Sequence, residues 1–404
     1  MSFVEAFNAL PLKSLLQISR ESSQDQALKS MRAPRKSIRD FAALLSPEAK
    51  SQEFLAQMCA ESQTITQRRF GKVIRMFAPL YVSNECVNNC KYCGFSRDNQ
   101  ILRVTLSIDE VVREAQELAR QGFRNLLIVS GEHPKFVERG YLADCTRAVR
   151  PWFPSISHEV GPMEAEDYIP IVQAGAEGLV VYQETYDREI YQQVHTAGPK
   201  KHFDWRLETP ERAYEAGFRR LGIGALHGLS DWRLEAISLA AHVQYLLKHC
   251  WKAQITISIP RLRPHAGDFD PLTQLSDLEL IQLITAFRIT FPDLGIVLST
   301  REPAHLRDGL IPLGVTMISA GSHTEPGGYT GAGKDNLHYT KKGRIEALAE
   351  NSSEWAPQAN RATNATGQFD IADERSPETM AALVRQLGYE PVWKDWDQAL
   401  TASD

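Results

Sequence analysis

Eight short runs rich in Val, Ile and Leu recur between residues 73 and 319 of this 404-residue chain, and stretches with the apolar spacing of amphipathic helices separate them. Parallel strands need a long crossover, usually a helix, so this alternation is typical of a parallel sheet. Eight such units over about 250 residues predict a (β/α)8 barrel. The expected strands are Val73–Val82, Asn125–Ser130, Ile156–Val160, Gly178–Tyr182, Arg220–Ala225, Gln254–Ile259, Gly295–Ser299 and Val315–Ser319.

An open, doubly wound sheet is the structural alternative to the barrel. Its dinucleotide-binding members carry a G-x-G-x-x-G turn after the first strand, and this turn is missing here. In a barrel, active-site residues lie at the carboxyl ends of the strands. Residues that follow the expected strands are therefore the candidates for a functional site.

Four regions are expected along the chain. Residues 1–70 carry helical patterns and form an N-terminal helical extension, and residues 71–325 form the barrel. Residues 326–368 are polar and rich in Gly and Asn, so we expect a long insertion loop there. Residues 369–404 form a C-terminal helix and tail, with Pro377 suited to the first helical position.

The charge balance limits the classes of partner. The chain has 45 Lys and Arg against 50 Asp and Glu, a formal charge of −5, which argues against a surface for nucleic-acid phosphates. No apolar run reaches the roughly 18 residues that span a bilayer, and the N-terminus lacks the apolar stretch of a secretory signal. We therefore expect a cytoplasmic protein that binds neither nucleic acid nor membrane.

Three of the six cysteines cluster directly after the first expected strand. Cys86, Cys90 and Cys93 form a C-x3-C-x2-C arrangement in a loop. Three thiolates held in one loop can bind three irons of a [4Fe-4S] cluster and leave the fourth iron open to another ligand. A structural zinc site completed by His133 or His158 is the alternative, although such sites normally use paired cysteine elements.

With Tyr92 before its last cysteine, the motif resembles the C-x3-C-x-aromatic-C signature of the radical S-adenosylmethionine (SAM) enzymes. The resemblance implies one [4Fe-4S] cluster per chain and SAM as the ligand of the open iron. In that family, one-electron reduction cleaves SAM to methionine and a 5′-deoxyadenosyl radical. The cofactor supplies the difficult chemistry, and the protein supplies position and shielding.

Further segments at or near strand ends resemble the aromatic amino acid lyases of that family, and most closely its tyrosine lyases of thiamine thiazole biosynthesis. The resemblance runs from about residue 70 to residue 397, nearly the whole chain. The segments that carry it are APLYVSNECVNNCKYCGFS, LLIVSGEHP, VVYQETY, WRLETPERA, GIGALHGLSDWR, IPRLRP, LSTRE, SAGSHTEPGGY and VWKDWD.

The same resemblance assigns residues that bind SAM, among them Tyr92 of the cysteine motif. Glu132, in Ser130-Gly131-Glu132, stands where the family binds the amino group of SAM, and a carboxylate there can form a charge-assisted hydrogen bond. A solvated strand-end carboxylate is the alternative. Gly222 and Gly224 match the segment that passes under the adenine, where a missing Cβ lets the backbone approach a flat ring. Both glycines also fit ordinary barrel packing.

A tyrosine substrate needs a cation for its carboxylate. Arg301, after the seventh expected strand, can offer two parallel hydrogen bonds, and an ion pair with Glu302 or with another carboxylate at the barrel mouth is its alternative role. Strand alternation places Tyr182 and Glu184 on one face and Gln183 on the other, which makes Tyr182 and Glu184 catalytic candidates.

Other polar groups lie near strand ends, and internal ion pairing is the expected role of at least half of them. They are Arg206, Glu208, Arg261 and Arg263. The residue that handles the phenolic proton stays open among four candidates. These are Tyr182, Glu184, His133 and His323.

The resemblance implies cleavage of the Cα–Cβ bond of L-tyrosine after hydrogen abstraction from its amino group. The products are p-cresol and 2-iminoacetate, which supplies part of the thiamine thiazole. Because 2-iminoacetate hydrolyses readily, we expect a complex with thiazole synthase (ThiG) and direct transfer of the product. A flavodoxin or ferredoxin is the expected reductant.

Three alternatives remain for the activity. The tyrosine lyase of hydrogenase maturation carries a second, C-terminal cluster motif, whereas no cysteine follows Cys250 here. A tryptophan lyase would differ in pocket contacts that the sequence does not assign. A non-catalytic iron–sulfur scaffold would use the cysteines alone and would need neither Glu132 nor Arg301.

Overall fold

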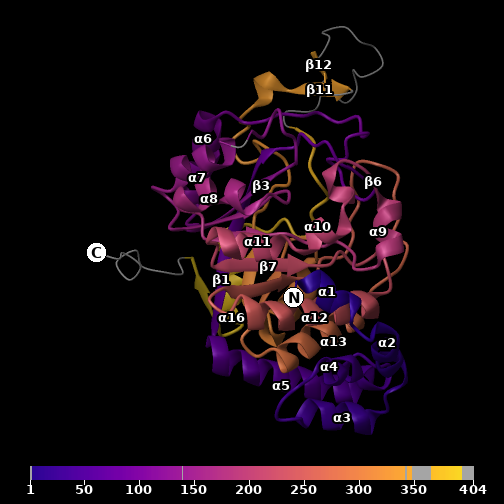
Figure 1. Ribbon diagram of the computed structural model, residues 1–404. Coiled ribbons are helices and arrows are strands. Elements are labelled where there is room, and N and C mark those ends of the chain that lie inside the picture. Colours follow the sequence, from indigo (N-terminus) through magenta and orange to yellow (C-terminus); the bar gives the residue numbers. More distant parts are fainter. Residues whose placement is uncertain (1, 139, 342–343, 348–364, 394–404) are drawn as a thin grey trace.

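The computed structural model describes residues 2–138, 140–341, 344–347 and 365–393 (Figure 1). Eight parallel strands follow one another around a closed barrel, because the last of them also pairs with the first. They are β1 (Val73–Ser83), β3 (Asn125–Ser130), β4 (Ser155–Glu159), β5 (Gly178–Val180), β7 (Arg220–Gly224), β8 (Gln254–Ser258), β9 (Gly295–Leu298) and β10 (Met317–Ser319). The predicted (β/α)8 barrel is confirmed, and every predicted strand boundary lies within two residues of the observed one.

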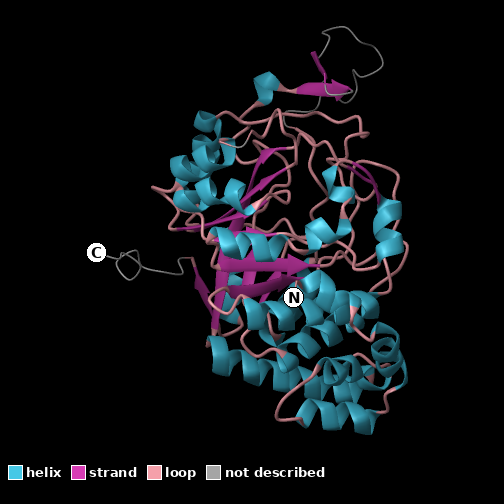
Figure 2. Ribbon diagram, in the orientation of Figure 1, coloured by secondary structure: helices cyan, strands magenta, loops and turns pink. Residues whose placement is uncertain are grey.

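Helices cover the outside of the barrel (Figure 2). They are α6 (Ile108–Arg120), α7 (Tyr141–Val149), α8 (Ala165–Gln173), α11 (Thr209–Ala216), α12 (Trp232–His249), α13 (Asp277–Thr290) and α14 (Ala304–Leu310). Capping boxes begin α6 at Ser107 and α13 at Ser276, so orphan backbone N–H groups at these ends are satisfied locally. A longer excursion joins β5 to α11. It contains α9 (Arg188–Val194), β6 (His195–Ala197), η2 (Pro199–Lys201) and α10 (Phe203–Leu207).

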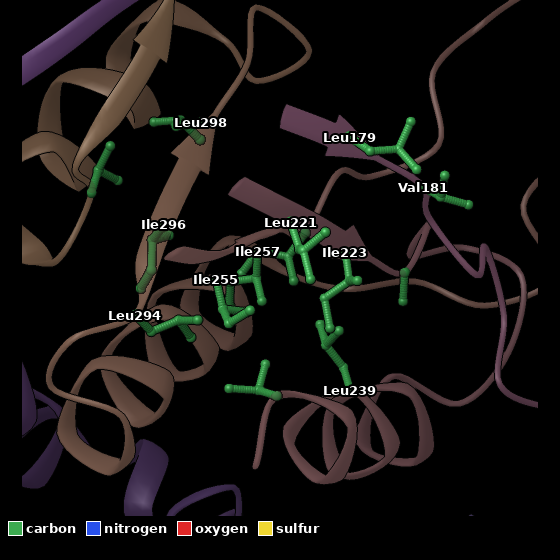
Figure 3. Packing of buried hydrophobic residues seen from close by; sticks show 14 of the residues in the cluster. Leu179, Val181, Leu221, Ile223, Leu239, Ile255, Ile257, Leu294, Ile296 and Leu298 are labelled. Carbon is green, nitrogen blue, oxygen red and sulfur yellow. The ribbon is translucent and has the colours of Figure 1, made fainter. Parts of the chain in front are cut away.

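The main apolar core lies between the strands and their helices. Figure 3 shows Ile223 of β7 beside Leu239 of α12, with further buried aliphatic side chains on β5, β8 and β9. The inward positions of β4 and β8 carry small polar residues instead, such as Ser157, Thr256 and Ser258. These small side chains leave space along the barrel axis beneath the carboxyl ends of the strands.

An N-terminal group of helices packs across α12 and α13 (Figure 1). It comprises α1 (Phe3–Asn8), α2 (Leu12–Glu21), α3 (Gln24–Arg32), α4 (Ile38–Leu44), η1 (Glu48–Lys50) and α5 (Gln52–Phe70). Phe41 meets Phe287 of α13 with ring centroids 4.7 Å apart, and Phe3 stacks on His242 of α12 at 3.9 Å. Among the described residues, none of the helices is both long enough and apolar enough to cross a membrane.

The region after β10 is more regular than the sequence predicts. Within the segment expected as a loop, η4 (Lys334–Asn336) precedes an antiparallel hairpin of β11 (His338–Lys341) and β12 (Arg344–Ala347). After α16 (Pro377–Gln386), β13 (Glu390–Val392) adds a ninth strand, parallel to the start of β1. This pairing is possible because β1 meets β3 only from Ala78 onward, which leaves its first residues free on that side. The tail beyond residue 393 lies outside the described residues.

Candidate active site

A cavity of about 610 Å³ lies among the carboxyl ends of β1, β3, β4 and β5. It brings together six of the residues that the sequence assigns to cofactor or catalysis, which are Cys86, Cys90, Cys93, Glu132, Tyr182 and Glu184. Its other lining residues include Asn88, Glu159, Lys200, Arg206 and Gln368. In (β/α)8-barrel enzymes the active site lies at the carboxyl ends of the strands, and this cavity lies there too.

The cysteine loop is held in shape by one buried arginine. Arg103 is only 1% exposed. Its guanidinium donates hydrogen bonds to the backbone carbonyls of Asn84 (2.6 Å), Phe95 (3.2 Å), Ser96 (2.8 Å) and Asn99 (3.4 Å). Cys90 also lies in β2 (Asn89–Cys90), which pairs with β6. The loop therefore has a defined shape before any ligand binds.

Glu132 lies beside the first cysteine. The side-chain amide of Asn88 donates to the Glu132 carboxylate at 2.7 Å and to Cys86 Sγ at 3.7 Å. Close packing explains the glycines around it: a Cβ on Gly131 would lie 2.1 Å from the Glu85 carbonyl oxygen, and one on Gly161 would lie 2.7 Å from the Glu132 side chain. The Ser-Gly-Glu segment thus reaches the cysteine loop because two glycines leave room for it.

The donor set fits an iron–sulfur cluster. Burial raises the pKa of the Cys90 and Cys93 thiols, so a strong positive charge such as iron is needed to hold them as thiolates. Within the described ranges, no three His, Cys, Asp or Glu side chains converge on one metal-ion position. Cluster cysteines bind different irons and so stand further apart than the ligands of a single ion.

The zinc alternative loses both of its proposed histidine ligands. His158 points away from the cavity, and its Nε2 lies 2.7 Å from the hydroxyl of Thr146 on α7. The ring of His133 packs edge-on against Phe136, and His133 is not among the cavity-lining residues. Neither histidine therefore completes the set of three thiols.

Glu184 is the centre of a buried charge network that also lines the cavity. Its carboxylate accepts hydrogen bonds from Lys200 Nζ at 2.7 Å and from Arg206 at 3.5 Å. Although burial raises the pKa of Glu184, the charges of Lys200 and Arg206 hold it below its usual value. Glu184 is also the one non-glycine residue with positive φ (71°) in the described part of the chain. Such strain persists where surrounding contacts fix the conformation.

The predicted alternation along this segment is present. Tyr182 and Glu184 both line the cavity, whereas Gln183 turns away and donates to the Phe203 carbonyl at 3.4 Å. Burial raises the pKa of Tyr182 well above its usual range. A Cβ on Gly224 would lie 2.7 Å from the Tyr182 ring, so this glycine makes room for the tyrosine.

Gly222 and Tyr92 lie outside this cavity. A Cβ on Gly222 would lie 2.8 Å from Val180, and the residue faces a smaller apolar space deeper in the barrel. The Tyr92 hydroxyl lies 2.6 Å from His195 Nε2, and its ring packs behind the loop with Cys90. Direct contact of Tyr92, Gly222 and Gly224 with SAM stays a prediction.

Arg301 stacks on an aromatic ring instead of pairing with an acid. Its guanidinium lies 3.4 Å from the centroid of the Phe369 ring. The alternative ion pair with Glu302 is wrong, because Glu302 is bound by Arg261, whose Nε donates to it at 3.0 Å. Among the described residues no carboxylate forms an ion pair with Arg301. Its charge nevertheless lowers the pKa of the cavity carboxyl Glu159, which locates it near the cavity.

Glu159 is a site residue that the sequence reading missed. It ends β4 and lines the cavity, and no described group forms a hydrogen bond with its side chain. Burial raises its pKa to about 7, with Glu184 adding to the effect and Arg301 opposing it. The signal was present in the order Ser155, Ser157, Glu159, because alternate small polar residues mark the face that points into the barrel.

The other candidates from the sequence have different partners or positions. His323 pairs with Glu325 at 3.0 Å and lines a separate surface groove beside α16. Arg206 and Arg261 form the internal ion pairs expected of at least half of their group, with Glu184 and with Glu302. Lys200 and Gln368, also missed, come from the β5–α11 excursion and from the segment after the insertion.

Comparisons with known proteins agree with this geometry. The Radical SAM superfamily model matches residues 80–240, and the Biotin and Thiamin Synthesis associated domain matches residues 258–390. The chain is 40% identical to 2-iminoacetate synthase of Escherichia coli (strain K12) over 89% of this chain and 88% of the relative. It also resembles the crystal structure of HydG, a maturase of the [FeFe]-hydrogenase, at TM-score 0.82 and 29% identity, covering 96% of this chain and 80% of that one. Methylornithine synthase shares the fold, with TM-score 0.66 and 19% identity over 93% of this chain and 98% of that one.

Proposed function

Because the chain belongs to the 2-iminoacetate synthase family of radical SAM enzymes, we propose that it cleaves L-tyrosine between Cα and Cβ to 2-iminoacetate and p-cresol. The family implies a [4Fe-4S] cluster and SAM. One observation supports the proposal most strongly: a single cavity carries the three cysteines together with Glu159, a carboxylate that no described group hydrogen-bonds. The cysteines suit the cofactors, and the unpartnered carboxylate suits an amino acid.

Cys86, Cys90 and Cys93 would hold the cluster, and Glu132 would bind the amino group of SAM. When bound and reduced, these cofactors supply a radical able to abstract a hydrogen atom. Asn88 orients Glu132 through its 2.7 Å hydrogen bond and keeps the carboxylate next to Cys86. The protein therefore fixes the position of the SAM amino group relative to the cysteine loop.

Arg301 would bind the carboxylate of tyrosine. Its flat face is covered by Phe369, so the N–H groups on its edge keep their capacity for two parallel hydrogen bonds to a carboxylate. Stacking also restricts the side chain before substrate arrives, which lowers the entropy cost of binding. In this role Arg301 aims the rest of the substrate into the cavity.

Glu159 is suited to take up a proton from the bound substrate. Its pKa of about 7 and its lack of a hydrogen-bond partner match the requirements of a general base that works near neutral pH. Glu184 is less suited to act as this base, because its ion pairs with Lys200 and Arg206 stabilise the ionised carboxylate and use its hydrogen-bonding capacity. Its role is to hold these two cations in place at the cavity wall.

The product chemistry points to a partner. 2-Iminoacetate hydrolyses in water, so a lined cavity and direct transfer to a thiazole synthase would protect it. Reduction of the cluster requires an electron donor, for which a flavodoxin or ferredoxin is suited. The proposed place of the enzyme is therefore the formation of the thiamine thiazole.

An anaerobic assay tests this function. The cluster is reconstituted, SAM, L-tyrosine and dithionite are added, and 5′-deoxyadenosine, p-cresol and glyoxylate, the hydrolysis product of 2-iminoacetate, are quantified. We expect p-cresol and glyoxylate in equal amounts. 5′-Deoxyadenosine without p-cresol would refute tyrosine as the substrate, and L-tryptophan is the matched alternative to add. No 5′-deoxyadenosine from protein with an intact cluster would favour an iron–sulfur scaffold.

A further inference from the structure

Gln368 reaches the cysteine loop from the far end of the chain. It lies 275 positions after Cys93, and its side-chain amide donates a hydrogen bond to Cys93 Sγ at 3.7 Å. Its backbone is fixed on both sides: its N–H donates to the Thr324 carbonyl at 3.0 Å, and its carbonyl accepts from the Gly94 N–H at 3.0 Å. The contact with the sulfur therefore rests on an anchored segment.

A second contact orients the amide. The hydroxyl of Tyr81, on β1, donates to Gln368 Oε1 at 2.8 Å. This bond occupies the oxygen and leaves the NH2 group towards the sulfur. The reverse orientation would place the amide oxygen against a sulfur that carries negative charge in a cluster, which is unfavourable. Tyr81 and Gln368 together present an N–H donor to Cys93.

The three cysteines differ in the hydrogen bonds that their sulfur atoms receive. Cys86 receives a similar hydrogen bond from Asn88 at 3.7 Å, but the same amide also donates to Glu132. Among the described residues, no side-chain amide donates to Cys90, which lies near the charge of Lys200 instead. Among the described side-chain amides, Gln368 thus donates to a cysteine sulfur without also contacting Glu132.

We propose that Gln368 sets the reduction potential of the cluster through its hydrogen bond to Cys93. A hydrogen bond to a cluster sulfur withdraws electron density and stabilises the reduced, more negative state. The inference rests on the proposed cluster and assigns a positioning residue for its reduction. The same segment carries Phe369 under Arg301, so one short stretch contacts both the cysteine loop and the proposed carboxylate site.

The test is an EPR-monitored redox titration of the reconstituted protein without SAM or tyrosine. Gln368→Leu keeps the approximate volume and removes the donor, and we expect a more negative midpoint potential at unchanged iron and sulfide content. Gln368→Glu, which places an acceptor and a charge against the sulfur, should shift the potential further in the same direction. Gln121→Leu is the control, because the Gln121 amide donates to Glu117 on α6, and it should leave the potential unchanged.

An unchanged potential in Gln368→Leu would overturn the proposal. If that variant fails to assemble a cluster, Tyr81→Phe decides, because it keeps Gln368 but removes the group that orients its amide. A negative shift in Tyr81→Phe supports the proposal, and an unchanged potential contradicts it. These outcomes are separate from those of the activity assay, because the titration contains no substrate and measures no product.

Discussion

The two walls of the cavity differ in which of their charged side chains have partners. On the cysteine wall, the loop that follows β1, Arg103 donates to four backbone carbonyls. On the charged wall, Glu159 at the end of β4 has no hydrogen-bond partner, and Arg301, which follows β9 and lies near Glu159, has no ion-pair partner among the described residues. Charged groups without partners keep their hydrogen-bonding capacity for a ligand.

One end of the barrel can therefore serve two ligands. A cluster needs ligands at fixed positions, and the partnered wall supplies a rigid loop before metal arrives. A substrate needs charges with free hydrogen-bonding capacity, and the charged wall keeps two of them. Glu184 is the exception on that wall, since Lys200 and Arg206 neutralise it.

The largest expected effect follows from the cysteine wall. Cys90→Ala should abolish 5′-deoxyadenosine formation, because three thiolates are needed to hold the cluster. Iron analysis and the anaerobic assay measure this. Cys145→Ala is the matched control, a buried cysteine on α7 that should keep iron and activity. Full iron content in Cys90→Ala would show that this wall does not hold the cluster.

Arg103→Met tests whether the loop is preformed. Removal of the guanidinium leaves buried carbonyls without donors, so we expect a loss of about 3–5 kcal/mol in the free energy of unfolding of the cluster-free protein. Urea denaturation measures it. Arg97→Met is the control, since its ion pair with Asp98 is exposed and should contribute less than about 1 kcal/mol. If the two variants were equally stable, Arg103 would not hold the cysteine loop in shape, and the cysteine wall would not be preformed.

Arg301→Met tests the charged wall. Loss of a charge-assisted hydrogen bond to the substrate carboxylate corresponds to about 1.5–3 kcal/mol, or about 10- to 150-fold weaker tyrosine binding. Calorimetry with SAM-loaded, unreduced protein gives the affinity, and tyramine, which lacks the carboxylate, is the matched ligand. We expect wild-type protein to prefer tyrosine over tyramine and the variant to bind both alike. A retained preference would locate the carboxylate site elsewhere.

Glu159→Gln should have the smallest effect and the clearest pH signature. Because the pKa of Glu159 is raised to about 7, its protonated form favours folding, and wild-type stability should fall as pH rises from about 4.5 to about 7. The glutamine variant lacks this loss, so it should be more stable than wild type at pH 8 by about 1–2 kcal/mol. In the wild type, p-cresol formation should rise with pH near 7 as Glu159 ionises, and in the glutamine variant this rise should be absent. Parallel stability profiles for both proteins would contradict the assignment.

The fold was predictable because its signals are local. Each strand is a continuous apolar run, and capping residues such as Ser107 and Ser276 begin the helices, so boundaries follow from neighbouring residues. β13 was missed because it pairs with the first residues of β1, which lie before the point where β3 begins to pair with β1. This offset between neighbouring strands is set by the closed barrel and not by the local sequence.

The cavity was predictable where a residue follows a strand directly, as the cysteines and Glu132 do. Gln368 was missed because its contact with Cys93 joins distant parts of the chain across an insertion. Lys200 lies in an irregular excursion between β5 and α11, and its ion pair with Glu184 depends on the path of that excursion. Such contacts follow from tertiary packing, which local periodicity does not encode.

The origin of the hydrogen that reaches 5′-deoxyadenosine shows whether the two walls of the cavity act on one substrate. If the charged wall presents the tyrosine amino group to the radical formed at the cysteine wall, single turnover in D2O should place one deuterium in 5′-deoxyadenosine, because amine hydrogens exchange with solvent. Tyrosine deuterated at carbon should then transfer none in ordinary water. Deuterium transfer from carbon, with none from solvent, would contradict the account.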